Sequence, residues 1–280
     1  MSKGNPAEGD NTPPAACLAG TGAAANVGGT TDDGSGLDAE VNEYDELLAS
    51  LGRTEEQDQR IAVHEAGHAV CARVLGHEVG GVTVNPDALR GYEGLCWGVG
   101  HTEAFAEGRG DASDVREAIA SEMPQAGEDR RHVADVFAEV YAKCIEFLAG
   151  RAAERLLLED EPAPPADDLR QARELTLLIC KSEEAIESFL THCEIAARDL
   201  SMPYGDVVIV LSTVLRIKRT LDGAEIDKII SDVEAGKALA IERRRRAEWR
   251  RREKSAEHFV AKHHHAGDAV APDPVHDLRA

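Results

Sequence analysis

The chain has 280 residues, of which 52 are acidic and 31 are lysine or arginine, so its formal net charge is −21. An acidic surface of this kind repels phosphate, which excludes a general nucleic-acid binder and leaves only local contacts open. Six scattered cysteines without a CxxC pair indicate reduced thiols, and the first residues lack the apolar stretch of a secretory signal. We therefore expect a soluble, cytoplasmic protein without a membrane segment.

The first half of the chain predicts helices around a small β-ribbon. Residues 1–37 carry almost no large apolar side chain, so we expect a disordered leader there. A helix is expected from Val41 to Leu51. A second helix is expected from Thr54, where Thr-Glu-Glu-Gln matches a capping box, to Gly76. Valines and glycines between residues 78 and 99 then predict a small antiparallel ribbon.

The second half of the chain predicts helices almost throughout. Apolar residues recur at helical spacing from Arg130 to about Leu158, and again from Asp167 to about Leu200. The segment from Val207 to Leu221 suits either a buried helix or a strand, and its length favours a helix. A last helix is expected from Gly223 to about Phe259.

These elements predict a mainly α fold, a helical metallopeptidase-like domain whose antiparallel β-ribbon lies next to the second helix. The expected organisation is a disordered leader (1–37), the helical domain (38–222), a long charged arginine-rich helix (223–260) and a disordered tail (261–280).

The second helix carries the most informative motif, the HExxH sequence His64-Glu65-Ala66-Gly67-His68. Two imidazoles four residues apart share one helix face, which suits two nitrogen ligands of a tetrahedral zinc ion. Between them, Glu65 is placed to take a proton from zinc-bound water and return it to a leaving amine. The alternative reading is a pair of partly exposed histidines on a solvated helix, but the strong apolar period around the pair predicts an interior position.

Four sequence blocks in the same order resemble the peptidase domain of the FtsH-type zinc proteases and together cover roughly residues 55–185. They are Ala62–Ala69 around the motif, Val82–Val84, Leu148–Glu154 and Ala166–Ala172. In that family an aspartate completes the metal site, and the resemblance selects Asp168 as the third zinc ligand.

The residues alone leave other readings of the third ligand open. Asp167 is the first alternative and Glu154 the second, and both aspartates could instead cap the helix that they begin. The small residues between Gly150 and Glu154 are expected to pack against the thin helix face at Ala66 and Gly67.

The resemblance implies a zinc metalloendopeptidase whose substrate is a polypeptide. The 280 residues contain no GxxxxGK[ST] phosphate loop, so we expect ATP-independent hydrolysis of unfolded or extended chains. An alternative is a catalytically inactive zinc-binding interaction or regulatory protein that keeps the fold, although an intact Glu65 argues against it.

The segment from Arg243 to Lys254 is the one strongly basic stretch. Interspersed glutamates favour a solvated helix with internal ion pairs. The alternatives are a docking arm for a protein partner, or a nucleic-acid-associated regulator that uses this helix.

Overall fold

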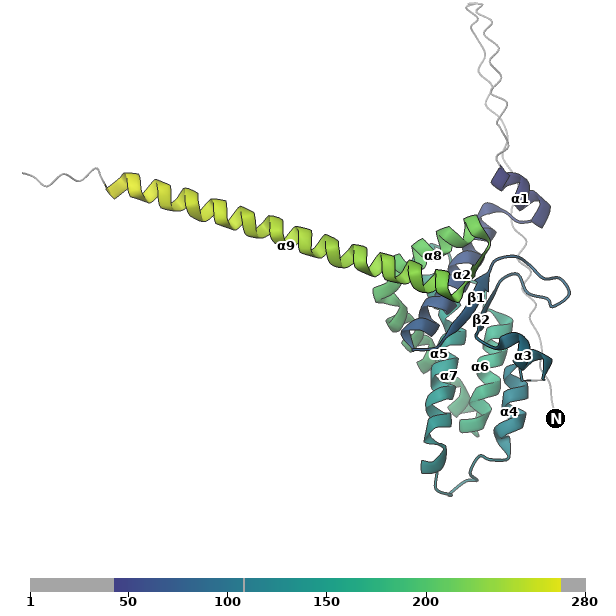
Figure 1. Cartoon of the computed structure of the whole chain (residues 1–280). Coiled ribbons are helices and arrows are strands. Elements are labelled where there is room, and N and C mark those ends of the chain that lie inside the picture. The colour runs from purple at the N-terminus through teal and green to yellow at the C-terminus, as the bar shows by residue number, and fades with distance from the viewer. Residues whose placement is uncertain (1–42, 108, 268–280) are drawn as a thin grey trace, which may run out of the picture. The chain divides into compact units, whose positions relative to one another are not determined.

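The computed structural model describes residues 43–107 and 109–267 of the chain, so the leader predicted for residues 1–37 lies outside the described residues. The described part is mainly helical with a small three-stranded antiparallel sheet, which confirms the predicted fold at this level (Figure 1). The helical elements are α1 (Glu43–Leu51), α2 (Glu55–Val74), α3 (His101–Ala106), α4 (Ala112–Ala120), η1 (Arg131–Val133), α5 (Ala134–Leu157), α6 (Ala166–Ile179), α7 (Glu183–Ser201), η2 (Met202–Tyr204), α8 (Gly205–Lys218) and α9 (Gly223–Gly267). The strands are β1 (Val79–Thr83), β2 (Leu95–Gly98) and β3 (Thr220–Asp222).

Helix α2 is the central element and carries the HExxH motif. Its predicted capping box is confirmed, because Thr54 and Gln57 exchange backbone-to-side-chain hydrogen bonds at the helix start. From residue 62 to residue 72 every side chain except the half-buried His64 is buried. The helix packs against α5 on one side and α8 on another, so polar groups on its middle turns are held away from bulk water and need partners.

Two apolar clusters form the core on either side of α2. One joins α5, α6 and α7, and includes Leu148 and Leu175. The other joins α2 to the sheet and α8, and includes Val70, Val82 and Leu211, each at most 2 % exposed. Residues of α2 contribute to both clusters, which fixes the rotation of this helix and so the direction of its polar residues.

The sheet has the strand order β2-β1-β3, with both neighbours antiparallel to β1. In the register, Val82 pairs with Cys96 on one side and with Leu221 on the other. Strand β3 was not predicted, because the segment from Val207 to Leu221 was expected to be one element. It is instead α8 followed by β3, with Arg219 at a positive φ of 69° between them. Strand β2 is left as an edge of the sheet.

A buried ion-pair network ties the start of α2 to the sheet. Asp58 is fully buried and accepts two hydrogen bonds from the Arg219 guanidinium, at 2.7 and 2.8 Å. Arg53 donates to the Val84 carbonyl at 2.6 Å, and the Tyr44 hydroxyl donates to Asp58 at 2.9 Å. Burial raises the pKa of Asp58, but the hydrogen bonds from Arg219 and Tyr44 outweigh it and leave that pKa below its ordinary value. The network fixes the sheet against the motif helix.

Two predicted boundaries are wrong. The single helix expected from Asp167 to Leu200 is two helices, α6 and α7, because Cys180 is extended and Ser182 caps α7 by accepting a hydrogen bond from the Ala185 N–H. The helix expected to end at residue 260 continues to Gly267 as α9, and residues 268–280 of the predicted tail lie outside the described residues.

One helical stretch, Glu183–Lys218, is long and apolar enough to cross a membrane by length and composition, with a window of mean hydropathy 1.4. The longest apolar run in the sequence, from Val207 to Leu215, has about half the length that spans a bilayer. Core helices of soluble proteins pass the same test, and Val207, Leu211 and Leu215 in this stretch are fully buried in the cluster around α2.

Candidate metal centre

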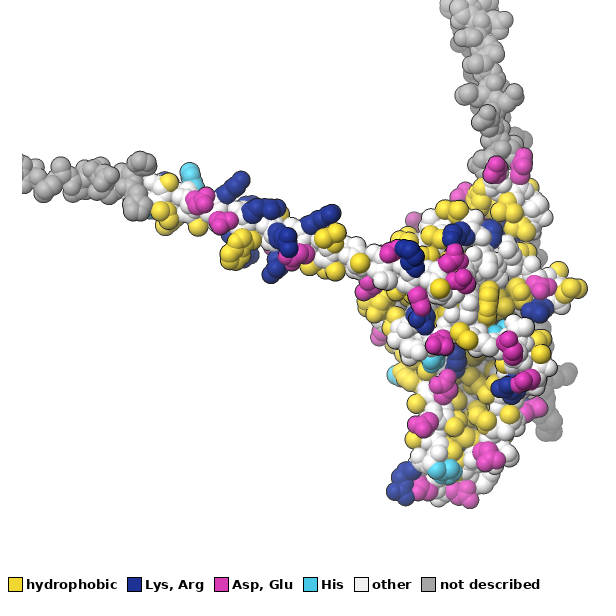
Figure 2. Space-filling model, viewed as in Figure 1, with side chains coloured by type: hydrophobic (Ala, Val, Ile, Leu, Met, Phe, Trp, Pro, Cys, Tyr) yellow, Lys and Arg dark blue, Asp and Glu magenta, His cyan; other side chains and the backbone are white. Residues whose placement is uncertain are grey.

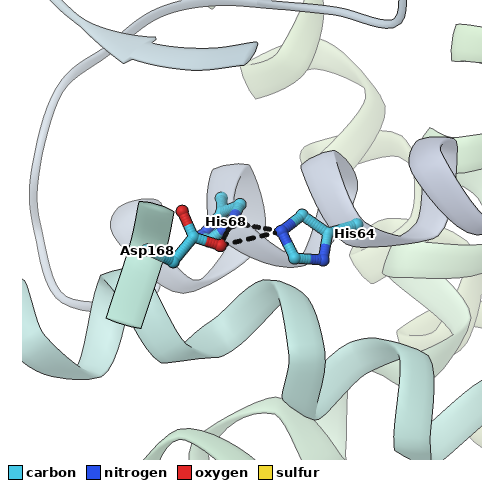
Figure 3. Close-up of side chains that lie close together, drawn as sticks. All are labelled: His64, His68 and Asp168. Carbon is cyan, nitrogen blue, oxygen red and sulfur yellow. Dashed lines mark hydrogen bonds and ion pairs between the residues drawn. The ribbon is translucent and has the colours of Figure 1, made fainter. Parts of the chain in front are cut away.

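Three side chains from two helices converge beside α5. His64 and His68 project from successive turns of α2, and Asp168 comes from the first turn of α6 (Figure 3). The two imidazole Nε2 atoms lie 3.0 Å apart, and Asp168 Oδ2 lies 3.0 Å from His64 Nε2 and 3.4 Å from His68 Nε2. Among the residues described, this is the one group of three potential ligands close enough together to hold a metal ion.

The far nitrogen of each imidazole is held by a hydrogen bond. His68 Nδ1 lies 2.7 Å from the backbone carbonyl of Glu146, which can only accept, so this nitrogen carries the proton. His64 Nδ1 lies 2.6 Å from Glu154, whose carboxylate also pairs with Arg60 at 2.8 Å. An ionised carboxylate likewise only accepts. In its neutral form, each imidazole therefore directs an Nε2 lone pair into the space between the rings.

A glycine on α5 keeps that space open. A Cβ on Gly150 would lie 2.5 Å from His64 Nε2 and 2.6 Å from His68 Nε2, closer than nonbonded atoms approach. Next to it, a Cβ on Gly67 would lie 2.6 Å from the Ala153 Cβ and 2.9 Å from the Ala149 carbonyl oxygen. This confirms the predicted packing of small residues between α2 and α5 and shows that the two helices are in close contact beside the site.

The structure separates the three candidates for a third ligand. Asp168 faces the imidazoles. Asp167, the first alternative, has a largely exposed side chain that pairs with Arg170 at 2.8 Å. Glu154, the second alternative, binds the outer nitrogen of His64 and so lies behind the ring. Of the three, Asp168 alone shares a face with both Nε2 atoms.

An arginine bridge holds the helix that bears Asp168. Arg170 pairs with Asp167 and also reaches Asp111, the N-cap of α4, at 2.5 Å. The Arg170 guanidinium holds the pKa of Asp111 well below its ordinary value. The bridge fixes the first turn of α6 against α4.

The charges around His64, His68 and Asp168 favour a positive charge between these three side chains. Burial lowers the pKa of His64, but hydrogen bonds to Asp168 and Glu154 outweigh it and raise that pKa to about 10. Burial likewise lowers the pKa of His68, and the Asp168 charge reverses the shift. Burial raises the pKa of Asp168, yet the two imidazoles bring it below its ordinary value. Without a metal, a proton on His64 supplies the charge.

Glu65 lies between the two histidines in sequence and faces the sheet. Its carboxylate is buried, sits against Gly94 and accepts a hydrogen bond from the Cys96 backbone N–H at the start of β2. Burial raises the pKa of Glu65 more than the nearby imidazoles lower it. The site therefore has a carboxylate with raised basicity next to an edge strand. Trp97 on the same strand packs over Gly81 of β1 rather than facing the cluster.

The sequence analysis did not identify three features that support the site: Arg60, the lack of a side chain at Gly150, and the Glu146 carbonyl. Arg60 lies four residues before His64 and so shares its helix face, a signal that was available. The carbonyl contact depends on how α2 and α5 pack, and no sequence pattern predicts it.

No family model matches the chain, and none of the curated proteins is significantly similar to it.

Proposed function

We propose that this protein is a zinc metallopeptidase that hydrolyses peptide bonds in extended polypeptides without ATP. The observation that carries the proposal is the convergence of His64, His68 and Asp168 beside the buried carboxylate of Glu65. The four sequence blocks that resemble FtsH-type peptidases support the same reading.

The geometry of the three side chains fits zinc. Ligand bonds of about 2.0–2.2 Å in a tetrahedral arrangement place ligand atoms about 3.3 Å apart, and the observed separations are 3.0 to 3.4 Å. Two neutral imidazoles with their free nitrogens facing each other repel unless a cation lies between them. Gly150 leaves the room such a cation needs. Three protein ligands also leave a fourth position open, as in catalytic zinc sites.

The outer hydrogen bonds would keep the ligands in place during turnover. Glu154 orients the His64 ring and increases its basicity, and Arg60 holds the Glu154 carboxylate. The Glu146 carbonyl orients the His68 ring in the same way and keeps the proton of that ring on Nδ1. These partners place both imidazoles before any metal arrives.

Glu65 is the proposed general base. A zinc ion in the site would lower the pKa of a coordinated water and polarise the substrate carbonyl. Glu65 accepts the proton and later donates it to the leaving amine. Its buried position suits both steps, because burial raises its pKa toward neutrality. The hydrogen bond from the Cys96 N–H holds the Glu65 carboxylate next to the start of β2.

Strand β2 supplies a place for an extended substrate. It is the edge of the sheet on the side of Glu65, and among the described residues its outer backbone groups pair with no other strand. A peptide can add there as a further strand through main-chain hydrogen bonds. Such binding requires an extended segment, which favours unfolded chains.

The test compares wild-type protein with Glu65→Gln, and uses Glu56→Gln, an exposed glutamate at the start of the same helix, as the matched control. We expect about one zinc ion per chain in all three, cleavage of denatured casein by wild type and control, and none by Glu65→Gln. Cleavage by Glu65→Gln would remove its assigned role. Zinc without cleavage in wild-type protein would favour the inactive zinc-binding alternative, and iron in place of zinc would overturn the proposal.

A further inference from the structure

The C-terminal part of α9 presents a concentrated positive charge that the metal centre does not use. Between Arg243 and Lys254 there are seven arginines and one lysine against two glutamates, a net charge of +6 in a chain whose total is −21. Every side chain from residue 243 to residue 263 is exposed. Figure 2 shows the lysine and arginine side chains gathered along this helix.

Four of the arginines form one face of the helix. Relative to Ala247, they stand at positions −4, −3, +3 and +4, and these spacings place side chains next to one another on a helix surface. We name these residues the arginine face: Arg243, Arg244, Arg250 and Arg251. Lys254, at position +7, extends it. Ala247, at the centre of this face, has only a methyl side chain, so it does not obstruct the approach of an anion.

The arginine face is not neutralised by the rest of the described chain. Glu242 pairs with Arg245 and Arg246 on other sides of the helix. No ion pair or hydrogen bond joins a side chain of the arginine face to any residue that the structure describes. Four unpaired guanidinium groups on one exposed face indicate an external anion.

We propose that the arginine face binds the phosphate backbone of a double-stranded nucleic acid. Guanidinium groups bind phosphate oxygens in pairs, and the segment uses arginine rather than lysine in seven of eight cations. A duplex presents phosphates at regular intervals, so a straight helix finds partners in any register. A single helix of about 10–12 Å diameter also matches the width of a major groove.

The opposite side of the helix disfavours a lipid surface. A helix that lies in a membrane interface needs a continuous apolar side beside its basic one. The exposed large apolar residues of that side are Ile241, Trp249, Phe259 and Val260. Two arginines stand among them: Arg245, four residues from both Ile241 and Trp249, and Arg252, three residues after Trp249 and seven before Phe259. Immersing this side would bury a guanidinium group in the acyl region.

The acidic remainder of the chain restricts the contact to α9. The net negative charge of the remainder repels phosphate, so the binding should be weak, independent of sequence and strongly dependent on salt. Binding at this helix would not require any peptidase activity at the metal centre.

The experiment measures fluorescence anisotropy of a labelled 24-base-pair DNA duplex titrated with the full-length protein at 50 to 200 mM KCl. Four phosphate contacts predict a log–log slope of about −3.6 and a loss of affinity of about 150-fold across this range. Replacing all four residues of the arginine face by glutamine should remove saturable binding at 100 mM KCl. Helix content by circular dichroism and zinc content should stay unchanged.

The control variant loses the same charge elsewhere. It replaces by glutamine four exposed arginines that each lie near a carboxylate: Arg90, Arg109, Arg131 and Arg198. Its affinity for the duplex should stay within about threefold of wild type.

Three parallel titrations identify the partner class. A single strand of the same length, poly-glutamate and vesicles with 30 % phosphatidylserine should each bind more weakly than the duplex. Tighter binding of any of them, equal loss of affinity in both arginine variants, or no duplex binding by wild-type protein at 50 mM KCl would overturn the proposal.

Discussion

Substituting Gly150 by alanine tests whether the space between the imidazoles holds a metal. The added Cβ would lie 2.5 Å from His64 Nε2 and 2.6 Å from His68 Nε2. Both rings would have to move by about 0.8 Å or more to reach ordinary contact, whereas metal sites tolerate about 0.2 Å. Neither ring can move without lengthening its Nδ1 hydrogen bond to Glu154 or to the Glu146 carbonyl.

Two effects of this substitution oppose each other. Alanine is favoured over glycine in a helix interior by about 1 kcal/mol, which would stabilise α5. At the metal site the clash with the two imidazoles outweighs this gain in helix stability. Loss of a residue that only hydrogen-bonds a ligand lowers metal affinity by about 10–100-fold, and displacing the ligands themselves should lower it at least as much. We expect zinc affinity to fall by about 100-fold or more.

The assay is competition for zinc with a chromophoric chelator, with thermal unfolding in EDTA measured on the same samples. Gly236→Ala is the matched control, since this glycine also lies within a helix and a Cβ there meets nothing within 4 Å. The control should gain stability by about 0.5–1 kcal/mol and keep its zinc affinity. If Gly150→Ala bound zinc within twofold of wild type, the metal would not lie where we infer.

Further outcomes follow from the same geometry. Asp168→Asn should lower zinc affinity by more than about 100-fold while Asp167→Asn leaves it unchanged; equal retention in both would return the search to Glu154. Glu154→Gln should lower zinc affinity by about tenfold, because the amide orients His64 less firmly than a carboxylate does, and an unchanged chelator titration would contradict this. In metal-free protein the pKa of His64 is about 10 against an ordinary 6.5, so its contribution to stability is complete below pH 6.5 and disappears as the pH rises through 10. The melting temperature in EDTA should therefore fall over that window, and a rise would refute the assignment. Denatured substrate should be cleaved and its native form spared, with or without ATP. The sequence contains no GxxxxGK[ST] phosphate loop through which ATP could supply the several kcal/mol that local opening of a folded substrate costs. Stimulation of cleavage by ATP would argue against this.

The parts of the site that could be predicted from the sequence are those whose residues lie close together in the chain. The spacing of His64 and His68 reported a shared helix face, and the capping box at Thr54 located the start of that helix, because both depend only on helical geometry. The mainly helical fold was predictable for the same reason. The contact between α2 and α5 was predicted on other grounds, namely that both segments carry small side chains. The break between α6 and α7 was missed although Ser182 and the two glutamates after it carried the signal of a helix start.

What the sequence alone determined was the local chemistry: two imidazoles and a carboxylate on one helix, and a cluster of arginines on another. Only the tertiary structure decided which distant groups meet them. Asp168 and Asp167 are adjacent and chemically alike, and the rotation of α6 against α2 separates a residue facing the imidazoles from one facing solvent. The role of Glu154 behind His64, the open space at Gly150 and the position of β2 beside Glu65 likewise depend on how α5 and the sheet pack. Packing of this kind depends on side chains far apart in the chain, so no local pattern records it.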